Sequence, residues 1–128
     1  MRKDKLKPTE SELEILNVIW QKGASTVRDV HTELEKRKES KYTTTLKLMQ
    51  IMHEKGLLIR DASARTHIFS AAIPKEETQG ELLKTIIENV YNGSASQLVM
   101  QALGNHKSSA EELEKIKQYL ETIENKDK

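Results

Sequence analysis

The spacing of apolar residues predicts a helix near the start of the chain. Four apolar residues recur at intervals of three or four, or lie side by side, as on one helix face: Leu13, Leu16, Ile19 and Trp20. Thr9, followed three residues later by Glu12, forms the capping-box pattern that begins a helix, and Gly23 can end it.

A second helix is predicted directly afterwards. Ser25 or Thr26 can cap its first turn, and Val27, Val30 and Leu34 share one face. The charged run of residues 35–39 follows, and we interpret it as a solvated helix end and loop.

The stretch from Tyr42 to Gly56 predicts a third helix with two different faces. Leu48, Met49 and Met52 gather on one side, whereas Thr43, Lys47 and Gln50 gather on the other. The polar side has hydroxyls, a cation and an amide, which suit phosphates and base edges. We interpret the stretch as a DNA recognition helix, although an amphipathic core helix would show the same pattern.

After Gly56 the periodicity changes to that of two short strands. Residues 57–59 and 66–72 are expected to pair as a hairpin around a polar turn at residues 60–65. Three helices and then a hairpin is the element order of a winged helix-turn-helix. In that arrangement Arg65, at the wing tip, would lie near the phosphate backbone or a minor groove.

The chain after Pro74 predicts helices that associate with one another or with a partner. A first helix carries a broad apolar stripe and runs to about Tyr91; the stripe consists of Leu82, Leu83, Ile86, Ile87 and Val90. Asn92 and Gly93 should break this helix. Ser94 or Ser96 can cap a short helix that Gly104 and Asn105 would end.

Ser109 and Glu112 form another capping box at the start of the last helix, whose apolar residues are Leu113, Ile116, Leu120 and Ile123. These helices could pack only within their own domain. We expect a homodimer instead, because about 50 residues supply little core of their own. A protein that binds the two half-sites of an operator also binds more strongly as a symmetric dimer. The expected domains are therefore residues 1–74, a winged-helix DNA-binding domain, and residues 75–128, a helical dimerisation domain.

Composition excludes several classes of protein. The 128-residue chain is 36% hydrophobic and 32% charged, and it has no cysteine, so disulfides and thiolate metal sites are excluded. No apolar run is long enough to cross a bilayer, and the first eight residues lack the apolar centre of a signal peptide. A cytoplasmic protein without membrane insertion is expected.

The charge is distributed unequally. Residues 1–74 carry a net charge of +4, and the remaining residues carry −3. A basic N-terminal half agrees with DNA binding, although so mild an excess does not establish it.

Chemistry at an active site has little support. The four histidines, His31, His53, His67 and His106, lie on different predicted elements without metal-ligand spacing, and no nucleophile elbow or phosphate loop is present. We therefore expect no enzyme, metal or cofactor. The alternative to a DNA-binding repressor is a winged-helix module for protein contacts.

Five motifs, in order, resemble the penicillinase-repressor family, the BlaI/MecI group of bacterial transcriptional regulators. They are TESELEILNVIW from Thr9, TVRDVHTEL from Thr26, the stretch from Tyr42 to Gly56, residues 65–70, and YNG from Tyr91. The resemblance covers nearly the whole chain. It implies a winged-helix domain, a helical dimerisation domain and repression at palindromic operators.

The DNA-contact residues that we expect are Lys41, Tyr42, Thr43, Thr44, Lys47, Gln50 and Arg65. Two departures from the family stand out: Ile51 replaces an arginine common among members, and the cysteine pairs of copper-responsive relatives are lacking. The resemblance further implies relief of repression by a membrane-bound metallopeptidase sensor. Carried over by spacing from Tyr91 and Gly93, the cleaved bond would join Gln101 to Ala102.

Overall fold

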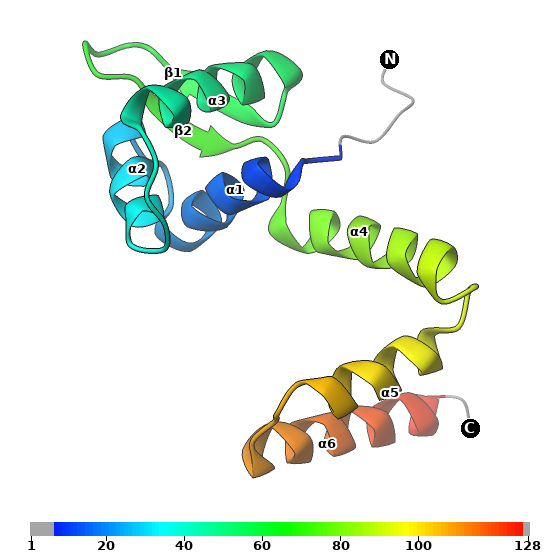
Figure 1. Cartoon of the computed structure of the whole chain (residues 1–128). Coiled ribbons are helices and arrows are strands. Elements are labelled where there is room, and N and C mark those ends of the chain that lie inside the picture. Colours follow the sequence, from blue (N-terminus) through cyan, green and yellow to red (C-terminus); the bar gives the residue numbers. More distant parts are fainter. Residues whose placement is uncertain (1–6, 127–128) are drawn as a thin grey trace. The chain divides into compact units, whose positions relative to one another are not determined.

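The structure is a computed structural model that describes residues 7–126 of the chain. Helices predominate, and a two-stranded hairpin separates the first three helices from the rest (Figure 1). The elements are α1 (Glu10–Lys22), α2 (Val27–Glu35), α3 (Tyr42–Lys55), β1 (Leu58–Asp61), β2 (Ile68–Ala71), α4 (Lys75–Val90), α5 (Ala95–Asn105) and α6 (Ala110–Lys126). The expected class, mainly helical with a small hairpin and an N-terminal winged helix, is confirmed.

Side-chain caps begin the first two helices. The Thr9 hydroxyl accepts from the Glu12 backbone N–H, and the Glu12 carboxylate accepts from the Thr9 N–H, so the predicted capping box is present. Thr26, rather than Ser25, caps α2 and forms a second capping box with Asp29. These reciprocal bonds satisfy backbone donors that a helix start would otherwise leave unpaired.

The third helix ends where its sequence predicts. Gly56 follows Lys55 with φ +88°, a left-handed conformation that glycine adopts at little cost. The N-terminal end of α3 lacks a side-chain cap: Lys41 occupies the cap position, and its side chain forms no cap hydrogen bond.

The core of the N-terminal unit lies between these three helices and the hairpin. Its fully buried side chains come from α1, α2, α3 and the segment before β1, and they include Ile15, Leu16, Val30, Met49, Met52 and Leu57. Leu48 is half-buried against this cluster. The predicted core face of the third helix is therefore confirmed.

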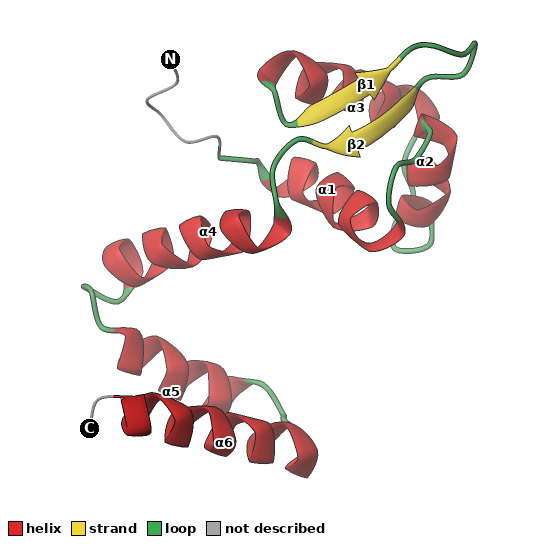
Figure 2. Ribbon diagram, turned by 180° about the vertical axis from the view of Figure 1, so that it is seen from behind, coloured by secondary structure: helices red, strands yellow, loops and turns green. Residues whose placement is uncertain are grey.

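The hairpin is antiparallel, with Leu58 opposite Ala71 and Asp61 opposite Ile68 (Figure 2). The strand bounds differ from the prediction: β1 extends through Arg60 and Asp61, which we expected in the turn, whereas β2 is shorter than the expected range of residues 66–72. Ser25, before α2, adds an isolated bridge, exchanging two backbone hydrogen bonds of 2.9 and 2.8 Å with Phe69. This bridge, which we did not predict, attaches the wing to the start of α2.

Contacts divide the chain into two units, Met1–Leu82 and Leu83–Lys128, so the division lies within α4. The first turns of α4 belong to the N-terminal unit, where Thr78 is buried and donates its hydroxyl to the Pro74 carbonyl at 2.9 Å. We expected the domain boundary at residue 74, where α4 begins. Pro74 predicts where α4 begins, but it does not predict that the first turns of α4 belong to the N-terminal unit.

The ends of α4 and α5 can be compared with the turn residues that were expected to break these helices. Asn92 and Gly93 have positive φ angles of 50° and 84°, and Ser94, rather than Ser96, caps α5. The expectation that the helix ends at Gly104 and Asn105 is confirmed to within a residue, because Asn105 is the last residue of α5. Gly104 itself is still helical, since one glycine in a helix costs only about 1 kcal/mol relative to alanine.

Candidate nucleic-acid interface

The outer face of α3 presents the predicted polar side chains together. Thr43, Thr44, Lys47 and Gln50 are all exposed, whereas Met49 and Met52 on the opposite face are fully buried. Residues 43, 47 and 50 recur with helical spacing, so their side chains follow one side of the helix. The face therefore combines donors and acceptors with one cation, as a surface that reads DNA requires.

A buried polar contact connects the N-terminal part of α3 to α2. His31 of α2 is 3% exposed, and its Nδ1 lies 2.9 Å from the hydroxyl of buried Thr45. The other ring nitrogen lies 3.3 Å from a Glu35 carboxylate oxygen. Thr45 belongs to the buried face of α3, so this contact holds the first turns of the helix against α2.

Arg28 was not among the predicted site residues, but the structure places it beside one of them. Its guanidinium carbon lies 4.3 Å from the centre of the Tyr42 ring, in cation–π geometry. His31 meets the same ring edge-on, with ring centres 5.5 Å apart. Tyr42 is thus half-buried and held by two residues of α2, which leaves less of it available to DNA than the sequence suggested.

The other end of α3 is connected to α1. The Lys55 ammonium donates to both oxygens of the Glu12 carboxylate, at 2.9 and 2.8 Å, and Glu12 is only 2% exposed. Burial alone would raise the pKa of Glu12, but hydrogen bonds from Lys55 and Thr9 outweigh it, and the pKa is lowered. The carboxylate therefore stays ionised and holds the last turn of α3.

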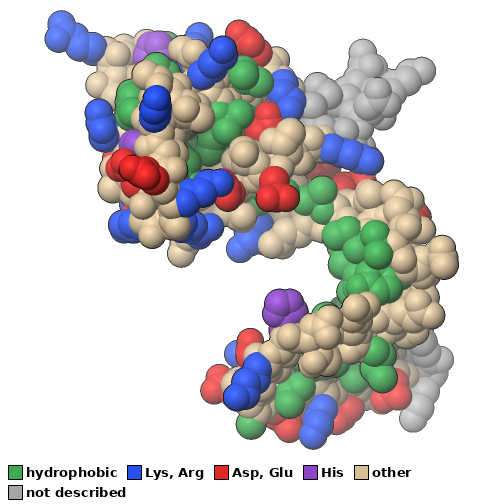
Figure 3. Space-filling view, viewed as in Figure 1, with side chains coloured by type: hydrophobic (Ala, Val, Ile, Leu, Met, Phe, Trp, Pro, Cys, Tyr) green, Lys and Arg blue, Asp and Glu red, His purple; other side chains and the backbone are tan. Residues whose placement is uncertain are grey.

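The wing contributes cations beside the same helix. Arg65 lies in the loop between the strands and is exposed, as predicted. The loop begins with a local turn in which the Asp61 carboxylate accepts from the Ser63 N–H at 2.9 Å, and this bond lowers the pKa of Asp61. Space-filling shows Lys and Arg side chains at several places on the N-terminal unit (Figure 3).

A groove of about 300 Å³ runs between α2, α3 and the wing. Its walls include three arginines, one each from α2, β1 and the wing loop: Arg28, Arg60 and Arg65. Gln50 and Tyr42 also line it, so three predicted residues meet here. Arg28, Arg60, Thr26 and His67 were missed, because only the fold brings α2 and β1 to this groove.

A second, more open groove of about 540 Å³ lies between α1 and α3. Thr43, Thr44 and Lys47 line it together with Thr9 and Ser11 from the start of α1. Lys41 is exposed at the cap position and lines neither groove. Six of the seven predicted contact residues therefore line two grooves that flank the outer face of α3, three in each, and Lys41 lies outside both.

Residues 7–126 include no group of three or more His, Cys, Asp or Glu side chains placed to hold a metal ion. None of the helices described there has the length and apolar character to span a membrane.

The sequence is similar to that of a known family along nearly its whole length. The profile of the penicillinase repressor family matches residues 8–122. The penicillinase repressor of Staphylococcus aureus is 24% identical over 116 residues, covering 91% of this chain and 92% of its own. That of Bacillus licheniformis is 25% identical over 120 residues, covering 94% of each chain.

A third relative, the methicillin resistance regulatory protein MecI of Staphylococcus aureus (strain N315), is 21% identical over 112 residues, covering 88% of this chain and 91% of its own. The matches therefore extend across both units rather than over the winged helix alone. Members of this family regulate transcription and are not enzymes. The chain belongs to the penicillinase repressor family of DNA-binding transcriptional repressors.

Proposed function

We propose that this repressor binds palindromic operators as a homodimer, with α3 of each subunit in a major groove. The observation that carries the proposal is the exposed polar face of α3, flanked by a groove with three arginines. Thr43, Lys47 and Gln50 would approach base edges or adjacent phosphates, and Arg65 the backbone beside the wing. Chromosomal DNA places this activity in the cytoplasm.

The proposal of a dimer rests on the C-terminal helices. No residue of α5 or α6 is buried in the described chain, although both helices carry large apolar side chains. Val90 is 66% exposed, Leu120 53% and Leu83 46%, and hydrophobic side chains reach the surface of this part (Figure 3). Exposed apolar surface of this extent on α4, α5 and α6 favours burial against a partner.

A second copy of the chain is the partner that we propose. Its contacts would be the two predicted stripes, Leu82, Leu83, Ile86, Ile87 and Val90 on α4 and Leu113, Ile116, Leu120 and Ile123 on α6, all of them exposed or half-buried here. Two-fold symmetry then matches a palindrome, with two copies of α3 about 34 Å apart, one turn of DNA.

One experiment tests the assembly and the DNA binding together. Sedimentation equilibrium should give a dimer at micromolar concentration, and fluorescence anisotropy with duplexes selected from a random library should show affinity that falls steeply with salt. Leu120→Glu, in the middle of the α6 stripe, should favour the monomer and weaken operator binding, whereas Glu121→Gln on the same turn should not. A monomer that binds no duplex at low salt would refute the proposal and favour a module for protein contacts.

We further propose that repression is relieved by cleavage between Gln101 and Ala102, downstream of a membrane-bound metallopeptidase sensor. Both residues are exposed on α5. A protease binds its substrate in extended form, so α5 must open locally first. Cleavage would separate α6 from the DNA-binding unit and remove half of the proposed dimer contacts.

The cleavage proposal has its own test. A chain that ends at Gln101 should be monomeric and bind operator much more weakly than the full chain, while its N-terminal unit keeps the same Trp20 fluorescence. Mass spectrometry of the repressor from induced cells should show a fragment ending at residue 101. Recovery of intact chain alone from fully induced cells would refute cleavage.

A further inference from the structure

The groove between α2, α3 and the wing carries positive charge that no acidic residue balances. We call it the arginine groove, because Arg28, Arg60 and Arg65 line it. No Asp or Glu is among its lining residues, and within residues 7–126 none of the three arginines forms an ion pair with a carboxylate. Three cations without carboxylate partners at one groove favour the binding of an anion.

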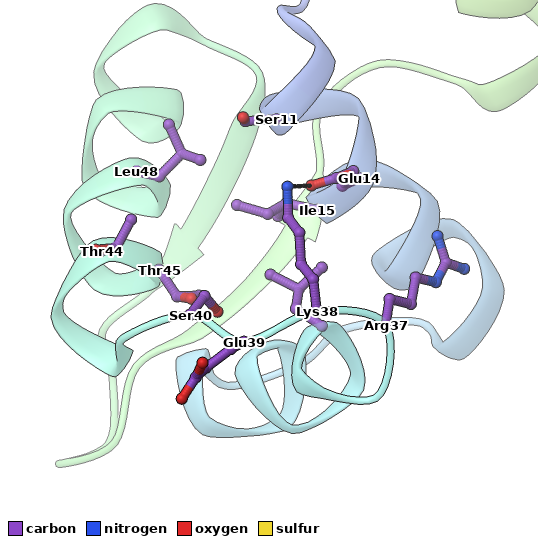
Figure 4. Close-up of a pocket in the computed structure, with 11 residues that line it drawn as sticks. Ser11, Glu14, Ile15, Arg37, Lys38, Glu39, Ser40, Thr44, Thr45 and Leu48 are labelled. Atoms are coloured by element: carbon purple, nitrogen blue, oxygen red, sulfur yellow. Dashed lines mark ion pairs between the residues drawn. The ribbon is translucent and has the colours of Figure 1, made fainter.

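The cavity on the opposite side of α3 differs in this respect. Glu14 and Glu39 line it together with basic residues of the end of α2 and the loop that follows. One of these, Lys38, has its ammonium nitrogen 3.7 Å from a Glu14 carboxylate oxygen (Figure 4). The cations of that cavity therefore have acids beside them, whereas those of the arginine groove do not.

Strand pairing determines the direction of Arg60. It lies directly opposite Phe69 in the hairpin, so the two side chains are on the same face. Phe69 is 2% exposed and belongs to the core, so this face is turned toward the helices. Asp61, the next residue, is therefore on the other face. The Arg60 side chain thus starts on the side of the groove, and the Asp61 carboxylate does not.

Arg28 keeps hydrogen-bond donors available although it contacts Tyr42. Its guanidinium carbon lies 4.3 Å from the ring centre, over the ring. A guanidinium group in this position uses its face for the aromatic contact and can still donate from the N–H groups at its edge, whose geometry matches phosphate oxygens. Leu46 and the Tyr42 ring add apolar surface to the same groove.

From these contacts we propose that the arginine groove binds the sugar–phosphate backbone of the operator, with Arg28 and Arg60 as direct phosphate ligands. The inference rests on the proposed function and deepens it, because the backbone beside the wing is held from α2 and β1 and not by Arg65 alone. The deoxyribose packs against Leu46 and Tyr42. Phosphate contacts fix the register of a protein on the duplex, and Gln50 lines the same groove, so this contact also positions Gln50 against the bases.

The first test is the salt dependence of binding by the full chain to its selected duplex, measured by fluorescence anisotropy. Arg60→Gln should weaken binding several-fold and flatten the slope of log affinity against log salt by about 0.9 for each lost phosphate contact. Arg60→Lys keeps the charge and should retain most of the slope. Arg37→Gln is the matched control: Arg37 is also exposed but lines the other cavity, so its loss should leave the slope nearly unchanged (Figure 4).

The second test locates the contact with a series of duplexes, in each of which a neutral methylphosphonate replaces one backbone phosphate. The wild-type chain should lose affinity when the phosphate bound by Arg60 is replaced. Arg60→Gln should lose nothing at that position, because the charge that binds the phosphate is already absent, but should lose as much as wild type at phosphates elsewhere. An unchanged urea midpoint, followed by Trp20 fluorescence, shows that each variant folds.

Two results would overturn the inference: a wild-type salt slope in Arg60→Gln, or a methylphosphonate series in which both chains lose equal affinity at every position. In either case, binding of the wild-type chain to its duplex would still support the proposed function. A wild-type chain that binds no duplex would refute the proposed function itself, and this inference with it.

Discussion

Removal of the Lys55 side-chain charge should destabilise the N-terminal unit more than removal of the Glu12 charge does. In Lys55→Met, the Glu12 carboxylate stays buried at 2% exposure and keeps only the Thr9 N–H. Leaving one partner of a fully buried pair uncompensated costs about 3–5 kcal/mol. Because the Lys55 side chain is 38% exposed, water can reach the site, and we expect about 2–3 kcal/mol.

Glu12→Gln should cost less. The glutamine carbonyl can still accept from Thr9, and the partly exposed Lys55 ammonium can turn toward water, so the expected loss is about 1 kcal/mol. The two variants should therefore lose unequal amounts of unfolding free energy, whereas a pair of equally exposed groups would give equal losses.

Urea unfolding of the full chain at fixed concentration measures both variants. Trp20 is the single tryptophan, and its indole N–H donates to the Ile73 carbonyl at 3.0 Å, so its fluorescence reports on the N-terminal unit. With an m-value of about 1 kcal/mol/M, the midpoint should fall by about 2–3 M in Lys55→Met. Lys36→Met removes the exposed ion pair with Glu33 and should leave the midpoint unchanged.

The pH dependence follows from the pKa of Glu12. In the native chain this pKa is lowered, so the contribution of Glu12 to stability is complete above its unfolded value, about 4.3, and is lost as the pH falls through the folded value. In Lys55→Met, burial should raise the pKa of Glu12, because the ammonium group no longer offsets it. Protonation of Glu12 then stabilises the variant as the pH falls. The penalty of Lys55→Met should therefore begin to shrink above the unfolded pKa of about 4.3, as the pH falls through the raised pKa of the variant, and should shrink further as the pH falls through the lowered pKa of the native chain. Equal losses in both variants, or a penalty independent of pH, would refute the reasoning.

The remaining predictions concern DNA binding and one turn. Lys47→Ala should flatten the slope of log affinity against log salt by about 0.9 per lost phosphate contact, twice that per dimer, in anisotropy titrations. Gln50→Ala should lose about 1–3 kcal/mol of discrimination at one base pair and little affinity for other sequences. Arg28→Ala, by freeing Tyr42, should weaken binding to every duplex alike; a sequence-specific loss would contradict a positioning role. Gly56→Ala, at φ +88°, should cost about 1 kcal/mol in the same urea assay.

Local patterns predicted most of the helices correctly because helices depend on near neighbours. The Thr9 capping box and the turn at Gly56 each involve residues a few positions apart, and the structure contains both. The bounds of the strands were predicted less accurately, because β1 continues through Arg60 and Asp61 by pairing with Phe69 and Ile68, which no local pattern shows.

The candidate site was less predictable because its contacts join residues far apart in the chain. Glu12 reads as an exposed capping residue, yet it is buried against Lys55, 43 positions away. Arg28 reads as an ordinary surface residue of a second helix, yet it lies over Tyr42. Neither contact can be predicted from the spacing of residues along the chain, because both depend on how the helices pack.

These long-range contacts have one physical consequence for the recognition helix. The cap position of α3 lacks a side-chain hydrogen bond, and the middle of the helix packs through Met49, a flexible side chain that specifies orientation poorly. Directional contacts occur instead near its two ends, His31 with Thr45 at one and Glu12 with Lys55 at the other. Two polar attachments on opposite ends fix the rotation of α3 about its axis, which apolar packing alone does not. The face with Lys47 and Gln50 is therefore directed outward by residues of α1 and α2 that need not touch DNA.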